Sequence, residues 1–239
     1  MIESDILIIG GGITGLCVAH QLINLKITKS IIILEKEDKL GMHTSGRNSG
    51  VLHAGIYYEP NTLKARVCVK GARRLKAWIK DKNLSINECG KYIVAQDECL
   101  DSELDKLHHR GISNGADVSL ITKEELSERF PEARTACQRA LWSPQTCVVD
   151  PKQVINSLKE DLKQQGVQIL VNSQYTSCIN NESKVIVGQG QQIKFKHLIN
   201  CSGIHACKVA KDFGLGKIYD IPLPNQKKGI IPSRDWKKK

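Results

Sequence analysis

The chain has 239 residues, of which 41% are hydrophobic, so it can bury one sizeable core and a smaller second one. Its formal net charge is +10, but aromatic residues make up only 5% of it, and nucleic-acid-binding surfaces need stacking residues beside their cations. The composition therefore excludes nucleic acid as the expected partner. No apolar run approaches the roughly 18 residues of a transmembrane helix, so we expect no membrane span.

The chain opens with a strand, a glycine turn, a helix, a second strand and an acid. The apolar runs 5–9 and 31–34 predict two buried strands. Between them lie Gly10, Gly12 and Gly15. In this pattern the first glycine permits a tight turn, the second lets a pyrophosphate approach the backbone, and the third lets the helix pack against the sheet.

The helix that follows the glycine turn is expected to hold phosphates at its N-terminus, beside Ile13 and Thr14, because unpaired N–H groups and the helix dipole favour negative charge there. Glu35, with Lys36 after it, ends the second strand 20 residues beyond Gly15. A carboxylate at this position accepts hydrogen bonds from an adenosine ribose and repels a phosphorylated one. The sequence therefore indicates FAD or NAD, and not NADP.

The segment 41–58 has the composition of a loop that follows a large polar cofactor. It combines four glycines, two histidines and a pair of tyrosines, and it contains no acid. After it, Asn61 is expected to cap a helix over residues 62–80. The buried stripe expected for this helix is Leu63, Val67, Gly71, Leu75, Trp78 and Ile79.

Residues 86–145 are expected to form an inserted α+β piece. It contains predicted strands over 90–96 and 140–143, and a helix that ends near Gly111. The sequence of residues 122–125 is that of a capping box, which predicts the start of another short helix.

The last third of the chain returns to alternating helix and strand. Asp150 followed by proline predicts a helix start. Strands are expected over 167–171 and 195–200, with a hairpin over 175–187 that turns at Asn180 and Asn181.

The final residues and the cysteines bear on location. Residues 226–239 carry a net charge of +5, half of the total, so we expect 223–239 to be a solvated basic tail, with weak attraction to an anionic membrane as the alternative.

Nine cysteines without a CxxC pair or zinc-ligand spacing indicate a reducing compartment and no metal site. Because the chain enters its first strand directly, we expect a cytoplasmic protein, or a mitochondrial one if a presequence is missing.

These residues resemble a known family. The glycine motif with Glu35, the segment 43–58 and the stretch 63–68 are together similar to the L-2-hydroxyglutarate dehydrogenases and oxidases, which are members of the D-amino-acid oxidase-like superfamily of FAD-dependent oxidoreductases. Further agreement comes from residues 89–91, 149–151 and 198–203. The resemblance covers residues 3 to 220 and ends near Tyr219, where family members continue, so it implies a C-terminally truncated member.

The resemblance implies an α/β fold with FAD as cofactor. A Rossmann-like FAD-binding domain of the D-amino-acid oxidase type would comprise residues 1–85 and 146–222, with a partial α+β substrate domain inserted over 86–145. Such enzymes oxidise L-2-hydroxyglutarate, a small 2-hydroxy acid, to 2-oxoglutarate and pass the electrons to a quinone or another acceptor.

The resemblance also implies a set of site residues. The cofactor-binding residues would be Gly10, Gly12, Ile13, Thr14, Gly15, Glu35, Lys36, Thr44, Ser45, Asn48, Ser49, Gly50, Val171, Ser202 and Gly203. Among them, Val171 would offer backbone groups to the adenine, and Ser202 and Gly203 would close over the pyrophosphate.

His53 is the expected catalytic residue, because an alcohol that loses a hydride to the flavin must also lose its hydroxyl proton to a base, and imidazole has a pKa of about 6.5. A structural histidine beside the cofactor is the alternative. Tyr57, Tyr58 and Arg66 are expected to bind the substrate's carboxylates, with a core position as the alternative for either tyrosine.

Four readings of the function stand at this point, of which an NAD-dependent dehydrogenase is the weakest, because the segment 41–58 would have no role in it. The first is FAD-dependent oxidation of L-2-hydroxyglutarate, by an intact or truncated enzyme. The second is a related FAD-dependent oxidoreductase that acts on an amino acid or on glycerol 3-phosphate. The third is a flavin-binding remnant without catalysis.

Overall fold

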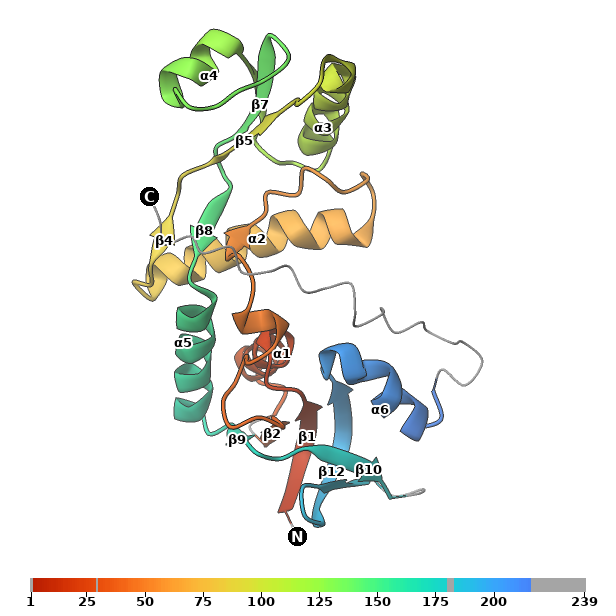
Figure 1. The fold of residues 1–239 in the computed structure, drawn as a ribbon. Helices are drawn as coiled ribbons and strands as arrows, with labels where there is room; N and C mark the ends of the chain where they lie inside the picture. The colour runs from red at the N-terminus through yellow and green to blue at the C-terminus, as the bar shows by residue number, and fades with distance from the viewer. Residues whose placement is uncertain (1, 29, 180–182, 216–239) are drawn as a thin grey trace. The chain divides into compact units, whose positions relative to one another are not determined.

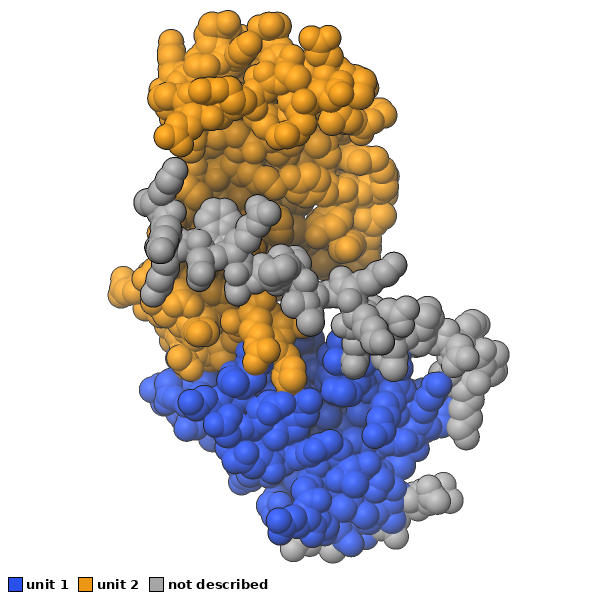
Figure 2. Space-filling model, in the orientation of Figure 1, with its two compact units in different colours: residues 1–42, 159–239 blue, residues 43–158 orange. Residues whose placement is uncertain are grey.

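The structure, a computed structural model, describes residues 2–28, 30–179 and 183–215 (Figure 1). The chain forms two compact units, coloured separately in Figure 2: unit 1 is residues 1–42 and 159–239, and unit 2 is residues 43–158. The expected domain boundaries at 85 and 146 do not coincide with these units. The division into a cofactor domain and a substrate domain stays a prediction, and the expected basic tail lies outside the described residues.

Unit 1 is built on a six-stranded sheet in the order β10-β11-β12-β1-β2-β9. Its strands are β1 (Ile2–Ile9), β2 (Ile31–Leu34), β9 (Gln168–Leu170), β10 (Tyr175–Cys178), β11 (Lys184–Val187) and β12 (Gln191–Asn200). Strand β1 pairs in parallel with β12 and β2, and β2 pairs in parallel with β9. The carboxyl ends of these four strands therefore lie at one edge of the sheet.

The two strands expected at the start of the chain form the centre of this sheet. All four residues of β2 are buried, and so are the last four of β1, as expected for parallel strands covered on both faces. Helix α1 (Ile13–Asn24) connects them and buries Gly15, Leu16 and Ala19. After β12 come a 3₁₀ turn, η3 (Gly203–His205), and α6 (Ala206–Asp212), whose Val209 joins the core of the sheet.

The expected hairpin is also confirmed: β10 and β11 are antiparallel, and β11 pairs antiparallel with β12. Its turn at Asn180 and Asn181 lies outside the described residues. Asp150 caps α5 (Pro151–Gln164) as expected, because its Oδ1 accepts the backbone N–H of Lys152 at 2.8 Å. The boundary between the two units falls inside α5.

Unit 2 contains two small antiparallel sheets. One has the order β3-β8-β4, from Val51–Leu52, Cys147–Val149 and Ile86–Asn87. The other has the order β5-β7-β6, from Lys91–Val94, Arg139–Ser143 and Ser119–Thr122. Its helices are α2 (Leu63–Asp81), α3 (Asp101–Ser113) and α4 (Lys123–Arg129), with 3₁₀ turns η1 (Thr44–Gly46) and η2 (Glu98–Leu100).

The first of these sheets joins strands from both sides of the expected boundaries at 85 and 146. Strand β8 pairs with β3 on one side and with β4 on the other. Residues 43–85 and 146–158, which were expected to belong with the dinucleotide strands, are thereby joined to the inserted piece.

Helix α2 confirms the expected helix, but with a different cap. Thr62, and not Asn61, is the N-cap, and its Oγ1 accepts the N–H of Ala65 at 3.2 Å. Asn61 instead has a φ of +66°, the left-handed conformation that asparagine tolerates better than most residues. Asn61 therefore makes the turn into the helix and Thr62 caps it.

The buried face of α2 also differs from the expected stripe. Leu63 and Val67 are 66% and 55% exposed, although Ile79 is buried as expected. The residues that are buried instead near the start are Ala65 and Val69. Apolar residues lie on both sides of this helix, so the sequence alone did not select the side that packs.

Candidate functional site

The residues of unit 1 that were expected to bind a dinucleotide gather at the carboxyl edge of its parallel strands. The glycine turn follows β1, Glu35 follows β2, Val171 follows β9, and the turn with Ser202 follows β12. Backbone hydrogen bonds join these strand ends: the N–H of Gly10 donates to Leu34 O, that of Glu35 to Leu170 O, and that of Cys201 to Ile9 O, each at 2.8 Å. Four segments distant in sequence thus meet at one edge.

The glycine turn approaches its neighbours so closely that side chains would not fit. Gly10 has a φ of +113°, and a Cβ there would lie 2.3 Å from the carbonyl oxygen of Cys201. A Cβ on Gly15 would lie 2.1 Å from the carbonyl oxygen of Gly10. These two glycines therefore let the β12 turn and the first turn of α1 close around the loop.

The N-terminus of α1 has the properties of an anion site. Its N-cap is Gly12, in an extended conformation without a side-chain cap, and the first turn contains no acidic residue. Ile13 and Thr14 are the first helical residues. The positive end of the helix dipole therefore faces no competing carboxylate on this turn, which suits the pyrophosphate of a dinucleotide.

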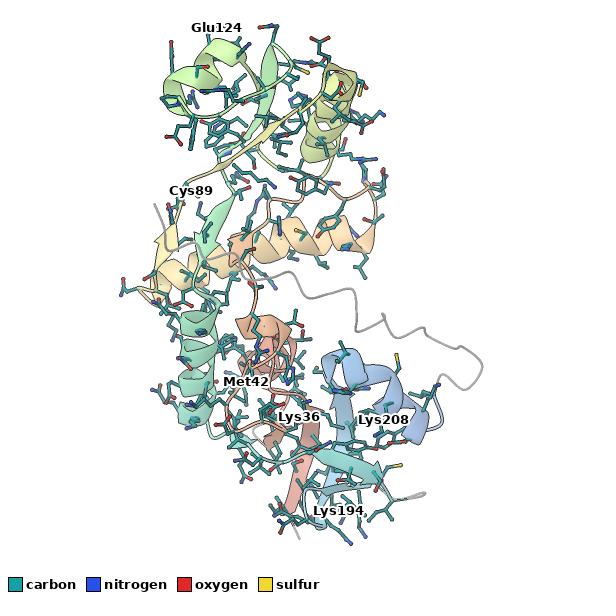
Figure 3. The ribbon with its side chains drawn as sticks, in the orientation of Figure 1. Lys36, Met42, Cys89, Glu124, Lys194 and Lys208 are labelled. Atoms are coloured by element: carbon teal, nitrogen blue, oxygen red, sulfur yellow. The ribbon has the colours of Figure 1, made fainter. Side chains whose placement is uncertain are left out.

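Glu35 is held in place by this loop. It is 7% exposed, and its Oε2 accepts the N–H of Gly11 at 3.1 Å, while its Oε1 accepts the N–H of Glu37 at 3.0 Å. A carboxylate has about four acceptor sites, so this pair of bonds fixes its orientation and leaves capacity for ribose hydroxyls. Lys36, labelled in Figure 3, lies 3.5 Å from Glu37 Oε1 and 3.5 Å from His205 Nε2.

The other expected contacts in unit 1 lie on turns. Ser202 donates its hydroxyl to Asn200 Oδ1 at 2.7 Å, which shapes the turn after β12, and Gly203 follows with a φ of +59°. Val171 is 38% exposed, immediately after β9. The positions of these residues suit the expected roles, and the roles themselves stay predictions.

In unit 2, the loop 43–50 is shaped by its own asparagine. Asn48 Nδ2 donates to the carbonyl oxygens of Thr44 at 3.0 Å and Ser45 at 2.9 Å, and its Oδ1 accepts the N–H of Gly50 at 2.9 Å. The side chain thus satisfies the loop's own backbone. The structure supports a role for Asn48 in forming the loop, whereas Thr44 and Ser49 remain exposed and able to reach a ligand.

Gly50 is explained by packing within unit 2. It has a φ of +68°, and a Cβ there would lie 2.0 Å from the carbonyl oxygen of Val149. The N–H of Val149 donates to Gly50 O at 2.9 Å. The glycine is therefore required by the approach of β8, independently of any cofactor.

His53 lies beside two residues that could take part in its chemistry. Its ring is edge-on to that of Tyr57, with centroids 6.5 Å apart and an interplanar angle of 79°. Lys91 Nζ donates a hydrogen bond to the Tyr57 hydroxyl and lies 4.5 Å from the centre of its ring. The backbone carbonyl of His53 accepts the thiol of Cys68 at 3.5 Å.

These surroundings favour the neutral form of His53. Although the residue is largely exposed, partial burial of its ring lowers the pKa of His53 below the ordinary value, and the positive charge of Lys91 lowers it further. A neutral imidazole can accept a proton, so the electrostatics fit the expected general base.

The remaining expected substrate residues are less closely associated with His53. Lys64 Nζ lies 4.7 Å from the centre of the Tyr58 ring, and the backbone carbonyl of Tyr58 accepts Asn114 Nδ2 at 2.8 Å. Arg66 is exposed on α2. Their roles stay predictions.

Lys91 was not among the residues expected from the sequence. The only signal was its position in the Cys89-Gly90-Lys91 stretch, just where β5 begins (Cys89 is labelled in Figure 3). A lysine at a strand start is common on protein surfaces, and its contact with Tyr57 joins residues 34 positions apart. That contact depends on the fold and could not be inferred from spacing.

Unit 2 has cavities beside α2 and beside β5. One, of about 280 Å³, lies against α2 and has Ala54, Val69 and Lys76 in its lining. The other, of about 600 Å³, follows β5 and has Lys91 in its lining, along with Phe130. The described residues contain no group of three or more His, Cys, Asp or Glu side chains arranged to hold a metal ion.

Known proteins resemble this chain along most of its length. Residues 5–231 match the family described as FAD dependent oxidoreductase (DAO). Human mitochondrial L-2-hydroxyglutarate dehydrogenase is 34% identical over 221 residues, which are 87% of this chain and 47% of that protein. The enzyme of the same name from Escherichia coli K12 is 32% identical over 213 residues, 88% of this chain and 50% of its own. The chain therefore spans about half the length of these curated relatives.

Solved structures agree in fold. L-α-glycerophosphate oxidase from Mycoplasma pneumoniae, with FAD bound, superposes with a TM-score of 0.77 at 26% identity and covers 89% of this chain and 57% of that one. Glycine oxidase from Geobacillus kaustophilus has a TM-score of 0.79 at 18% identity, over 90% of this chain and 59% of that one, and so shares the fold. These matches confirm the expected fold class and the expected resemblance, and FAD is the cofactor of the family. The chain belongs to the DAO family of FAD-dependent oxidoreductases.

Proposed function

We propose that this chain binds FAD and takes part in the oxidation of L-2-hydroxyglutarate to 2-oxoglutarate. The observation that carries the proposal is the cradle in unit 1, where the glycine turn, the start of α1, Glu35 and the Ser202 turn meet at one sheet edge. The glycine turn and the uncapped N-terminus of α1 fit a pyrophosphate, and the fixed carboxylate fits a ribose. The names of the relatives, at 32–34% identity, suggest the substrate.

In this proposal, different residues bind the cofactor, accept the proton and hold the substrate. Gly10 and Gly15 let the turn and the start of α1 pack closely, Gly12 lets the pyrophosphate approach the backbone, and Glu35 accepts hydrogen bonds from the adenosine ribose. FAD, when bound, supplies the acceptor for the hydride that leaves C2 of the substrate. His53 takes the proton of the C2 hydroxyl as the carbonyl forms, and Tyr57 and the other expected substrate residues hold the carboxylates.

The visible spectrum of the purified chain tests the proposal. A flavin band that bleaches under anaerobic L-2-hydroxyglutarate supports both parts of it. His53→Ala is expected to keep the flavin band and to lose the bleaching, because only the proton acceptor is removed. Reduction of the His53→Ala protein at the wild-type rate would refute the assignment of the base.

A second function is carried by the match to L-α-glycerophosphate oxidase, which at 26% identity superposes over 89% of the chain. The same spectral experiment therefore includes glycerol 3-phosphate. It also includes glycine, for the alternative that the substrate is an amino acid. Bleaching by one of these, without bleaching by L-2-hydroxyglutarate, would replace the proposed substrate. A flavin band that no substrate bleaches would favour the flavin-binding remnant.

We also propose that the electrons pass to a quinone in a membrane that the protein touches peripherally. None of the described helices is long and apolar enough to cross a bilayer. On α2, however, exposed Leu63 and Val67 share a helical face with Lys70 and Arg74, and apolar residues beside cations suit an anionic lipid surface.

Vesicle sedimentation tests this contact. The chain should sediment with phosphatidylglycerol vesicles and not with phosphatidylcholine vesicles, and the double variant Lys70→Gln/Arg74→Gln should sediment less. Equal sedimentation of the variant would refute a role for this face.

For the compartment we propose the cytoplasm, with mitochondria as the alternative that the human relative's name suggests. Cell fractionation distinguishes the two.

A further inference from the structure

A lysine that no motif singled out lies next to the expected base. Lys91 Nζ donates a hydrogen bond to the Tyr57 hydroxyl, and the Tyr57 ring in turn lies edge-on to His53 with the ring centroids 6.5 Å apart. All three residues belong to unit 2. Tyr57 therefore contacts both the ammonium group of Lys91 and the ring of the expected base.

The charge of Lys91 is not neutralised within the described part of the chain. The contacts of its ammonium group are the hydroxyl and ring of Tyr57, both uncharged. Other lysines of unit 2 differ in this respect: Lys80 pairs with Glu88 at 2.7 Å, and Lys106 pairs with Glu103 at 2.5 Å. An ammonium group held in place without a counterion is a ready partner for a ligand carboxylate.

The hydrogen bond between Lys91 and Tyr57 also sets the direction of the tyrosine hydroxyl. An ammonium group can only donate, so the Tyr57 oxygen is the acceptor in this pair. The phenolic O–H proton then remains available for donation to another acceptor. A carboxylate at this point would receive one hydrogen bond from Lys91 and one from Tyr57.

We propose that Lys91, with Tyr57, binds the carboxylate at the far end of the substrate from the hydroxyl that His53 deprotonates, and thereby selects a dicarboxylate over a monocarboxylate. Carbons C2 and C5 of such a substrate are three bonds apart, as consecutive Cα atoms are, which is about 3.8 Å when extended. A hydrogen bond of about 3 Å at each end lets the molecule bridge groups up to about 10 Å apart. The ring centroids of His53 and Tyr57 are 6.5 Å apart, so a substrate of this length can contact both side chains.

The inference rests on the proposed function for the hydroxyl, but binding of the carboxylates does not require turnover. The test therefore uses glutarate, a five-carbon dicarboxylate without a hydroxyl, and pentanoate, which has the same chain length and one carboxylate. The full chain carries ¹³C-labelled histidine, and the shift of the His53 C2–H resonance reports binding of each acid.

Lys91→Met is the informative variant, because methionine keeps an unbranched apolar side chain one atom shorter than that of lysine and removes the charge. The matched control is Lys64→Met: Lys64 Nζ also lies over a tyrosine ring, that of Tyr58 at 4.7 Å, but Lys64 is not among the charges that act on His53. A purely structural cation over an aromatic ring would give the same result in both variants.

Wild type and Lys64→Met should bind glutarate about 10- to 100-fold more tightly than pentanoate, as a hydrogen bond to a charged group contributes about 1.5–3 kcal/mol. Lys91→Met should lose that preference and bind pentanoate within about threefold of wild type. The inference is overturned if Lys91→Met keeps the glutarate preference, or if wild type has none.

The spectral experiment separates this inference from the proposed function. Loss of the glutarate preference in Lys91→Met, without bleaching by L-2-hydroxyglutarate in wild type, would leave the carboxylate site standing and refute the proposed reaction. Bleaching in wild type, with an unchanged glutarate preference in Lys91→Met, would support the proposed reaction and refute the carboxylate site.

Discussion

Replacing Gly15 by alanine tests whether the close approach of α1 to the glycine turn depends on the missing side chain. A Cβ at this position would lie 2.1 Å from the carbonyl oxygen of Gly10, and real Cβ atoms essentially never come within 3.0 Å of another heavy atom. The helix and the turn would have to move apart by about 0.9 Å, the difference between these distances. Gly10 does not yield easily, because its N–H donates to Leu34 O at 2.8 Å.

Two terms of opposite sign set the change in the free energy of unfolding. Alanine is more favourable than glycine in a helix interior by about 1 kcal/mol. Forcing a methyl group against main-chain atoms costs about 3 kcal/mol, the upper end of the usual range for overpacking, because no flexible side chain can move aside. The net destabilisation is about 2 kcal/mol, and with a urea m-value of about 2 kcal/mol/M the midpoint of unfolding falls by about 1 M.

Gly71→Ala is the matched control, since Gly71 lies in the exposed part of α2 and a Cβ there would meet nothing within 4 Å. Only the helix term remains, so the free energy of unfolding should rise by about 1 kcal/mol and the midpoint by about 0.5 M. Circular dichroism in a urea series measures both variants. If Gly15→Ala were as stable as Gly71→Ala, the steric argument for the cradle would be refuted.

Three further predictions concern the site and one helix. Lys91→Met should raise the pKa of His53 towards 6.5, because the positive charge of Lys91 lowers it. A histidine NMR titration that shows no rise would refute the effect of Lys91 on His53. Gly12→Val should abolish FAD binding, measured by the visible spectrum, because its side chain blocks the pyrophosphate; a fully flavinylated variant would rule this out. Asp150→Ala should destabilise the protein by about 1 kcal/mol through loss of the α5 cap, whereas Asp150→Asn should keep most of the stability in the same urea assay.

The sequence by itself determined the features that neighbouring residues control. The strand, glycine turn, helix, strand and Glu35 are encoded within 35 residues, and the structure has them where the pattern predicted. The capping box at Thr122 and the cap at Asp150 are likewise local, because a side chain there bonds to the backbone two or three residues on. Such features depend on hydrogen bonds within one turn of the chain, so the local sequence is enough to predict them.

The tertiary structure decided which side of α2 packs. Periodicity favoured Leu63 and Val67, yet the buried residues are Ala65 and Val69. Val69 reaches Gly55 so closely that a Cβ there would lie 2.6 Å from Val69 Cγ2. With apolar residues on both sides of the helix, only the shape of the surface it meets could choose between them.

The same division holds in the candidate site. Glycines and an acid at fixed spacing predicted the dinucleotide cradle, and His53 and Tyr57 were found from a single segment. The contact of Tyr57 with Lys91, and the requirement for glycine at residue 50 beside Val149, join segments 34 and 99 positions apart. Local pattern specifies the dihedral angles and caps of each element, whereas the partners that a side chain meets across the fold follow from how complete strands and helices pack.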